Sequence, residues 1–319
     1  MSRDISLDTV SGILILWMIY EHYNVSSGLY LSFAPPFLFC FMAWFFFKSG
    51  MFHKQKKDKE IVIHGWKRLI IPYLSFTMIG FFTGIIVKFI NNDLDFVHYT
   101  FQSVWQIAKM GGVNYCMPIW FLLSLYFVRL LFNVFINKRI HPITIAFSSF
   151  IIADILYRTG MKYPCYLGNV ALGICFYSLG YVLKKMQYDN RLFVLAILIY
   201  SPIYILIPSN VDVRANICNM GYYEVYYISA ICSIIILNNL FRRIQFLNIK
   251  IIQSIGRDSM TYYLTHWGVM SIVMVCITRF ASQSDAMSNF ICLIVVSAVV
   301  LPLLNRLLHK EKFRLIIGE

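Results

Sequence analysis

The chain has 319 residues, of which 59% are hydrophobic and 13% charged, and its mean hydropathy is +0.66. About a quarter of the residues in a soluble domain are charged, and no polar block here is long enough to form its own core, so a soluble catalytic domain on a membrane anchor is excluded. The net charge of +13 comes from basic residues that alternate with apolar segments, which argues against a nucleic-acid partner and for a membrane protein.

The chain begins MSRDISLD, with two acidic residues and no apolar stretch ahead of a small-residue cleavage site. This start predicts that no signal peptide is removed. Eight cysteines lie scattered along the sequence without a CxxC pair or a Cys/His cluster, which argues against a zinc or iron–sulfur site. We therefore expect no metal.

Ten segments are apolar over a length close to the roughly 20 residues that a helix needs to cross a membrane. In chain order they are 7–24, 29–51, 69–90, 118–136, 142–158, 166–183, 192–208, 221–240, 258–278 and 289–308. The fifth and the seventh are short. The sequence therefore predicts an all-α, polytopic membrane helix bundle of about ten transmembrane helices, in a single domain over 1–319 with no soluble domain.

With both termini in the cytoplasm, the inner segments hold 19 of the 28 Lys and Arg residues, and the outer segments, with Arg158 at their border, hold 5. Cytoplasmic loops carry an excess of these residues, so the asymmetry predicts that both termini are inside. The strongest inner marker is the run HKQKKDK at 53–59, which fits a topology signal with headgroup contact as well as a ligand-binding segment. The longest outer segment, 91–117, is expected to hold a short interfacial helix.

Ionisable groups inside membrane spans are costly, so they usually face the bundle interior and mark function. In the first span, Asp8, Ser11 and His22 follow helical spacing, and Ser11 and His22 lie within about 20° of each other on one face. His22 is expected roughly 22 Å beyond the inner start of this helix, in the outer half of the membrane. Glu21 precedes it, about 100° around the helix.

Four cations stand at or near the inner ends of spans, namely Lys48, Lys67, Arg68 and Arg129. Any one of them alone can extend its charge to the lipid headgroups. Together, and with Ser49 beside Lys48, they form a predicted inner cluster suited to binding phosphates.

Two later spans carry further polar groups. Asp154 and Arg158 are spaced i, i+4 and are predicted to form a structural ion pair, while Glu224 opens the eighth span without a local partner. In the ninth span, Ser259 and His266 are seven residues apart and share a face, and His266 is expected near the middle of the membrane.

Five short motifs follow one another along the chain. They are Leu7–Ile13 with His22 fourteen residues after Asp8, then Phe46–Gly50, Arg68–Tyr73, Ile119–Leu122, and Ile255–Ser259 followed by Tyr263–His266. In this order and on this helix plan they resemble membrane acyltransferase family 3, which includes bacterial O-acetyltransferases of O-antigen, capsule and nodulation factors. The segment Phe176–Tyr181 is similar to the fucose 4-O-acetylase-like branch of that family.

The resemblance implies an O-acetyltransferase of the bacterial cytoplasmic (inner) membrane. It implies that acetyl-CoA donates an acetyl group, or another acyl-CoA a longer or charged acyl group, to a carbohydrate hydroxyl. The acceptor is then a surface polysaccharide or its lipid-linked precursor. The cofactor-binding residues expected for the donor are those of the inner cluster.

The resemblance also implies that His22 is the catalytic base, or else a transiently acylated nucleophile. His266, Ser259 and Tyr263 are the candidates for orienting that base or donating hydrogen bonds to the oxyanion. Glu21 is expected to orient His22 or to bind a sugar hydroxyl. Further residues expected on the substrate side, or in a structural role, are Asp8, Trp120 and Glu224.

One position departs from the family pattern. Many members carry Arg or Lys eleven residues before the first-helix histidine, where this chain has Ser11. A cationic role cannot be assigned to a serine, so Lys48 or Arg68 is the predicted substitute.

The competing hypothesis is a transporter or flippase of a lipid-linked sugar, in which the polar face lines a passage and no bond forms. Transporters are often built from inverted repeats with paired broken helices, and the sequence has neither. A scaffold without enzymatic activity would leave His22 and His266 without a function.

Overall fold

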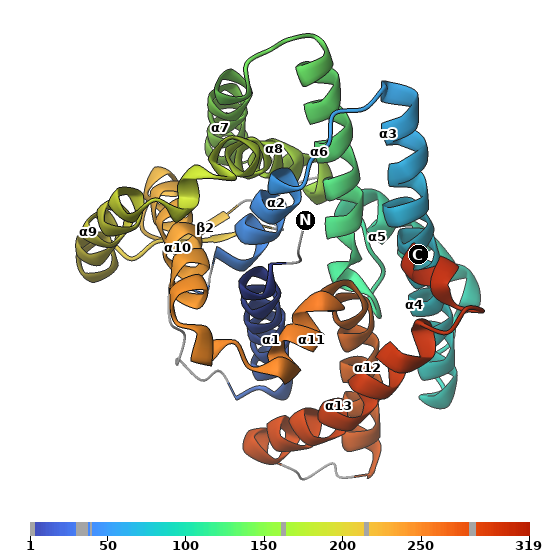
Figure 1. Cartoon of the computed structure of the whole chain (residues 1–319). Coiled ribbons are helices and arrows are strands. Elements are labelled where there is room, and N and C mark those ends of the chain that lie inside the picture. Colours follow the sequence, from blue (N-terminus) through green and yellow to red (C-terminus); the bar gives the residue numbers. More distant parts are fainter. Residues whose placement is uncertain (1–3, 30–37, 39, 161–163, 214–216, 281–284) are drawn as a thin grey trace. The chain divides into compact units, whose positions relative to one another are not determined.

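The computed structural model describes residues 4–29, 38, 40–160, 164–213, 217–280 and 285–319 (Figure 1). These residues are mostly helical, so the predicted all-α class is confirmed. The helices are α1 Ile5–Ser27, α2 Phe41–Met51, α3 Asp58–Gly65, α4 Ile71–Ile90, α5 Phe96–Met110, α6 Trp120–Asn137, α7 Pro142–Arg158, α8 Cys165–Leu183, α9 Asn190–Leu206, α10 Tyr223–Arg243, α11 Lys250–Arg257, α12 Ser259–Phe280 and α13 Ala286–Leu308. Between α9 and α10, strands β1 (Asn210–Asp212) and β2 (Ile217–Met220) pair antiparallel.

Each of the ten predicted spans carries a helix, and α7 covers residues 142–158 as predicted. In the second span, residues 30–37 and 39 lie outside the described part of the chain, and α2 begins at Phe41. Within the described residues, six helical stretches are long and apolar enough to cross a membrane, namely Asp58–Ile90, Met117–Asn137, Tyr166–Leu183, Tyr223–Arg243, Ser259–Phe280 and Ala286–Leu308. The number of ten spans and the cytoplasmic position of both termini stay predictions.

Several helix ends follow directly from local sequence. Helices α5, α9 and α13 begin after Asp95, Asp189 and Asp285, whose side chains accept hydrogen bonds from main-chain N–H groups of the first turn. Helix α5 ends at Gly111, which adopts φ 76°. Glycine takes this left-handed conformation without the strain of a Cβ atom, so the helix stops there.

The chain divides into two compact units, and each is made of several segments. The first unit comprises 1–14, 34–65 and 124–257, and the second comprises 15–33, 66–123 and 258–319. Helices α1 and α6 each contribute residues to both units. The prediction of one domain over 1–319 stays a prediction.

In the first unit, α2 and α8 pack main chain against main chain. A Cβ atom on Gly50 would overlap the carbonyl oxygen of Tyr177, and one on Gly180 would overlap that of Phe47. Only glycine permits this approach at both places. Two segments that carry the family resemblance, Phe46–Gly50 and Phe176–Tyr181, therefore lie side by side.

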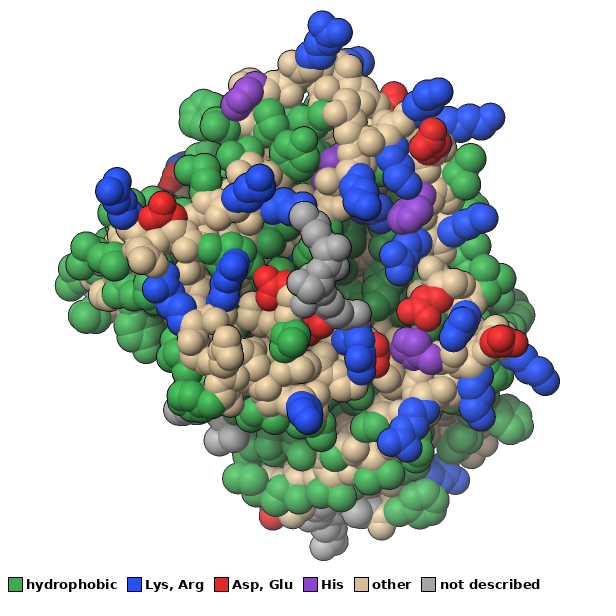
Figure 2. Space-filling view, in the orientation of Figure 1, with side chains coloured by type: hydrophobic (Ala, Val, Ile, Leu, Met, Phe, Trp, Pro, Cys, Tyr) green, Lys and Arg blue, Asp and Glu red, His purple; other side chains and the backbone are tan. Residues whose placement is uncertain are grey.

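Helices α9 and α10 of the same unit pack through a small apolar core of Ala196, Cys232 and Ile235. The opposite side of α9 exposes large apolar side chains, with Leu198 65% and Ile205 75% exposed. Figure 2 shows hydrophobic side chains gathered over this helix, the leftmost element of Figure 1. Such a surface is expected of a helix that faces lipid.

In the second unit, α5 is the helix predicted for segment 91–117. Tyr99 is 1% exposed and its hydroxyl donates a hydrogen bond to the carbonyl oxygen of Phe81 on α4, at 3.1 Å. Its ring lies against Gly84, where a Cβ atom would overlap the tyrosine. The other face of α5 exposes Val97 and Phe101, which gives the amphipathic character of an interfacial helix. The helix is confirmed, and its contact with lipid stays a prediction.

Candidate functional site

Two histidines from helices far apart in sequence meet in the second unit. His22 Nδ1 of α1 lies 3.0 Å from His266 Nε2 of α12, and the two ring planes are parallel within 7°. His266 is fully buried and His22 is half-buried. A distance of this size between ring nitrogens is a hydrogen bond. The pair joins the two histidines that the sequence analysis singled out in membrane spans.

The contacts of His266 fix the protonation pattern of the neutral pair. His266 Nδ1 lies 2.8 Å from the carbonyl oxygen of Tyr263 and 3.2 Å from that of Tyr262. A carbonyl oxygen only accepts hydrogen bonds, so His266 Nδ1 carries its proton. His266 Nε2 then accepts, His22 Nδ1 donates, and the lone pair of His22 is on Nε2. This tautomer makes Nε2 of His22 the basic nitrogen of the pair.

Trp267 completes the surroundings of the pair. Its indole lies edge-on to the His22 ring, with ring centroids 5.0 Å apart and an angle of 84° between the ring planes. Its Nε1 donates a hydrogen bond to the carbonyl oxygen of Asn114 at 2.9 Å, which fixes the position of the indole. The His22 imidazole is therefore held by a hydrogen bond on one edge and by an aromatic ring beside it.

The other candidates on α12 have different surroundings. The Tyr263 hydroxyl donates its proton to the carbonyl oxygen of Pro118. A tyrosine hydroxyl has one proton to donate, so in this arrangement the proton of Tyr263 is engaged by the Pro118 carbonyl, and its oxyanion role stays a prediction. Ser259 begins α12, seven residues before His266, and is half-buried. Glu21 is also half-buried, next to His22 on α1.

The segment Pro118–Phe121 contacts α12 through this tyrosine. Besides the hydrogen bond at Pro118, the Phe121 and Tyr263 rings pack against each other with their centroids 5.8 Å apart. Trp120, the first residue of α6, is 5% exposed and its ring packs against that of Phe121. These contacts give Trp120 a structural place in the packing against α12, the helix that carries His266.

In the first unit, Lys48 of α2 points its charge into the protein. Its Nζ donates a hydrogen bond to the Ser11 hydroxyl on α1, and it lies 5.2 Å from the centre of the Trp44 ring. Ser11 is fully buried. The alternative of a lysine that extends to the headgroups therefore does not describe Lys48. Of the two predicted substitutes for a cation at position 11, Lys48 is the one that contacts Ser11.

The remaining members of the predicted inner cluster are divided between the units. Arg129 belongs to the first unit and is half-buried, with its Nη2 3.4 Å from His64 Nδ1. Ser49 is half-buried beside Lys48. Lys67 and Arg68 belong to the second unit, where both are exposed on the π-helical turn Trp66–Ile70.

His53, which follows α2, is a residue that sequence reasoning missed as a candidate. It is 9% exposed, its Nδ1 lies 2.8 Å from the Tyr177 hydroxyl, and its ring packs edge-on against Phe132 and Tyr181. Burial and the positive charge of Arg129 lower the pKa of His53 to about 4. The imidazole is thus neutral at pH 7, although the sequence places it at the head of a basic run.

This buried neutral histidine predicts a pH dependence of stability. In the unfolded chain a histidine has a pKa of about 6.5, so protons favour unfolding as the pH falls from about 6.5 towards 4. The cost is on the order of 3 kcal/mol at the lower end, and it is absent above pH 7. We expect the melting temperature of the wild type to fall over this range, and that of His53→Phe to fall less steeply. Parallel curves for the two proteins would contradict the assignment.

Three acidic residues from the sequence analysis take structural places in the first unit. Asp8 is buried on α1, where its main-chain carbonyl touches Gly256 of α11. The predicted ion pair of Asp154 and Arg158 is confirmed at 2.8 Å. Arg158 also binds the Glu224 carboxylate, the partner that local sequence did not reveal.

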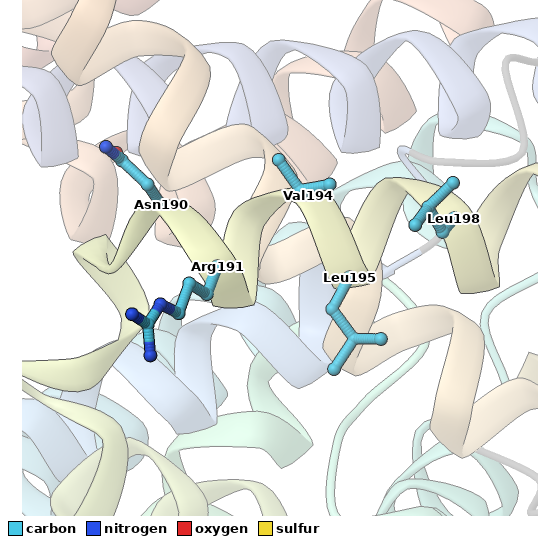
Figure 3. A pocket seen from close by; sticks show the side chains of 5 residues that line it. All are labelled: Asn190, Arg191, Val194, Leu195 and Leu198. Carbon is cyan, nitrogen blue, oxygen red and sulfur yellow. The ribbon is translucent and has the colours of Figure 1, made fainter.

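A shallow cavity of about 420 Å³ lies along α9 and is lined by Asn190, Arg191, Val194, Leu195 and Leu198 (Figure 3). It contains none of the predicted site residues. Among the described residues, no three His, Cys, Asp or Glu side chains are grouped so as to hold a metal ion.

Comparison with known families gives one match. The model of a family described as an acyltransferase domain matches residues 4–306, nearly the whole chain. No curated protein and no solved structure matches the chain. The six apolar helices agree with a multi-pass membrane protein. The match contains all five sequence motifs and both histidines of the hydrogen-bonded pair, and the chain belongs to membrane acyltransferase family 3.

Proposed function

We propose that this protein transfers an acyl group, most simply acetyl, from acyl-CoA to a hydroxyl of a carbohydrate, with His22 as general base. The observation that carries the proposal is the hydrogen bond between His22 Nδ1 and His266 Nε2, combined with the bond from His266 Nδ1 to a main-chain carbonyl. Together they leave Nε2 of His22 as the nitrogen able to take a proton. Family membership supplies the reaction class.

In the proposed reaction, His22 Nε2 takes the proton of the acceptor hydroxyl while that oxygen attacks the thioester carbonyl carbon. The tetrahedral intermediate then collapses, the carbon–sulfur bond breaks, and the coenzyme A thiolate receives the proton back from His22. The products are the carbohydrate ester and the free thiol. His266 stays neutral throughout and accepts the His22 Nδ1–H, so it stabilises the imidazolium that forms after proton uptake.

A second route makes His22 a nucleophile that carries the acyl group for part of the cycle. The two routes differ in kinetics. An acyl-histidine intermediate gives ping-pong kinetics and a burst of thiol equal to the enzyme concentration when the acceptor is omitted. General base catalysis requires both substrates to be bound together, and we favour this route because the His22–His266 contact orients a base.

We further propose that the donor comes from the cytoplasm and that cations bind its phosphates. The candidates are Lys48, Lys67, Arg68 and Arg129, with Ser49 as a neighbouring hydroxyl. Arginine and lysine are suited to this role because each donates charge-assisted hydrogen bonds to phosphate oxygens. The acceptor proposed is a bacterial surface polysaccharide or its lipid-linked precursor, modified at the inner membrane, in keeping with the similarity of Phe176–Tyr181 to the fucose 4-O-acetylase-like branch.

The test uses the purified full chain in lipid nanodiscs with acetyl-CoA and glycans extracted from cells that lack the gene. We expect release of free thiol that depends on the glycan, and a glycan that gains the mass of one acetyl group per site. A flippase would instead move a lipid-linked sugar across vesicles without releasing thiol. Movement of the sugar with no thiol release under any condition would overturn the enzymatic proposal.

A further inference from the structure

The surroundings of Lys48 are more elaborate than a lipid-facing lysine requires. Its ammonium is bound by the Ser11 hydroxyl on one side and lies over the Trp44 ring on the other. Ser11 and Trp44 are both fully buried. An ammonium over an indole face gains a cation–π interaction of about 0.5–2 kcal/mol. Both contacts belong to the first unit, so the position of this charge is set within one compact body.

A chain of buried hydrogen bonds fixes the tryptophan in turn. Trp44 Nε1 donates to Asn238 Oδ1 on α10 at 2.8 Å, and Asn238 Nδ2 donates to Gln187 Oε1 at 2.7 Å. Gln187 lies in the 3₁₀ turn after α8, and it and Asn238 are fully buried. Buried polar groups are costly unless each is bonded, and a fully bonded network holds its members in one arrangement. The relay Gln187–Asn238–Trp44 therefore fixes the indole under the Lys48 ammonium.

The main chain of α2 is fixed on either side of Lys48. Phe47 touches Gly180 of α8 through its carbonyl, and Gly50 touches the carbonyl of Tyr177. The helix that carries Ser11, α1, is also fixed, because its main chain touches α11 where a Cβ atom at Gly12 would overlap the main chain of Ile252. Both helices that meet at the Lys48–Ser11 contact are thus held by direct main-chain packing.

A charge fixed in this way is suited to binding an anion. A lysine that only anchors a helix at the headgroups gains from a mobile side chain and needs no buried relay. A binding site benefits when its charged group is held in place before the ligand arrives, because less side-chain entropy is lost on binding. The relay, the buried serine and the glycine contacts all supply that preorganisation.

We infer that Lys48 is a fixed interior cation that binds the phosphate groups of the acyl-CoA donor, and that Ser11, Trp44 and Asn238 are positioning residues for it. The inference rests on the proposed function, which supplies the donor. It deepens that function by assigning Asn238, a residue of α10 outside the resemblance motifs, to donor binding through the indole of Trp44.

The first experiment measures binding of two probes, coenzyme A and pantetheine, to the full chain in nanodiscs. Pantetheine lacks all the phosphates. We expect Lys48→Met to weaken coenzyme A binding at least tenfold, which is the size expected for one charge-assisted contact, and to leave pantetheine binding unchanged. The matched control is Lys88→Met. Lys88 is also a lysine within a span, but its Nζ binds Asp93 at 2.9 Å, and its loss should leave both affinities unchanged.

A second experiment moves the charge to the other helix. The double variant Ser11→Lys with Lys48→Ser exchanges the two side chains, so that the ammonium comes from α1 and the hydroxyl from α2. We expect it to restore coenzyme A affinity to within about threefold of wild type, whereas Ser11→Ala weakens it only severalfold. This variant also decides the matter if Lys48→Met fails to fold, because it keeps one ammonium and one hydroxyl in the interior. A folded double variant that binds coenzyme A about tenfold or more weakly than the wild type overturns the inference for Ser11.

The positioning role of Asn238 is tested by a double-mutant cycle. Asn238→Leu removes the acceptor of the Trp44 N–H, and we expect the KM for acyl-CoA to rise about fivefold at unchanged kcat. In the Lys48→Met background the same change should have no further effect on KM, because the cation that Asn238 positions is gone. Additive effects on KM would show that Asn238 acts independently of Lys48 and would overturn its positioning role.

The outcomes separate this inference from the proposed function. A wild type that binds no coenzyme A and releases no thiol overturns the function and the inference together. A wild type that binds and turns over acyl-CoA, with Lys48→Met unchanged in both affinity and KM, overturns the inference and leaves the function intact. A loss of pantetheine and coenzyme A binding alike in Lys48→Met also overturns it, because the charge would then not act on phosphates.

Discussion

Replacing His22 by alanine is expected to lower acyl transfer by about 10²–10⁴-fold while the chain still folds and inserts into the membrane. The side chain is half-buried and its hydrogen-bond partner, His266, keeps its own bond to the main-chain carbonyl of Tyr263, so the loss of the imidazole leaves α12 with its contacts. The rate loss therefore reports the base and not the fold.

The measurement is thiol release from acetyl-CoA by wild type and His22→Ala, at equal amounts of protein that elute as one species. The matched control is His98→Ala. His98 is an exposed histidine of α5 in the same unit as His22, and we expect its replacement to leave the rate unchanged. Acetylation that continues at the wild-type rate in His22→Ala would remove His22 from the chemistry.

Local patterns predict what depends on one helix. The i, i+4 spacing of Asp154 and Arg158 predicts their ion pair, and the apolar segments predict the helices, as the structure confirms. The partner of His22 depends on packing between residues 244 positions apart, as the hydrogen bond to His266 shows. Periodicity placed each histidine within its own helix, and no periodicity relates two helices. The pair was therefore visible only as two separate candidates.

Lys48 illustrates a second limit. Its sequence position, near the end of an apolar run, is typical of a lysine that extends to the headgroups. What turns it inward is the small Ser11 on α1 and the close packing of α2 on α8 at Gly50 and Gly180. From sequence alone, a glycine inside a helix predicts a less stable helix. Which neighbouring helix packs closely against that glycine depends on the folded bundle.

His53 was missed for a related reason. It stands at the head of a run of four lysines, and this composition predicts a charged segment at the membrane surface. In the structure it turns away from that segment and packs against Phe132, Tyr177 and Tyr181. Composition predicts the average environment of a loop, whereas the environment of one side chain depends on the cavity that neighbouring helices leave.

Replacing His266 is expected to have the second largest effect, and the choice of substitute separates its possible roles. The proposed role requires only an acceptor for the His22 Nδ1–H. His266→Leu removes that acceptor, so the wrong tautomer of His22 is no longer disfavoured and the imidazolium loses its partner. We expect kcat to fall by about 10²–10⁴-fold, with little change in the KM for acyl-CoA.

His266→Gln retains an oxygen that can accept the same hydrogen bond, and we expect it to keep at least about tenfold more activity than the leucine variant. Both substitutions remove the ring, and with it the packing against Tyr263 and Trp267. Packing alone therefore predicts the same loss for both, or a smaller loss for leucine because it is apolar. Steady-state kinetics of the two variants, with melting temperatures to show that both are folded, separate these cases. Glutamine that outperforms leucine in kcat assigns His266 to holding the proton on Nδ1 of His22, and equal losses would reduce His266 to a packing residue of α12.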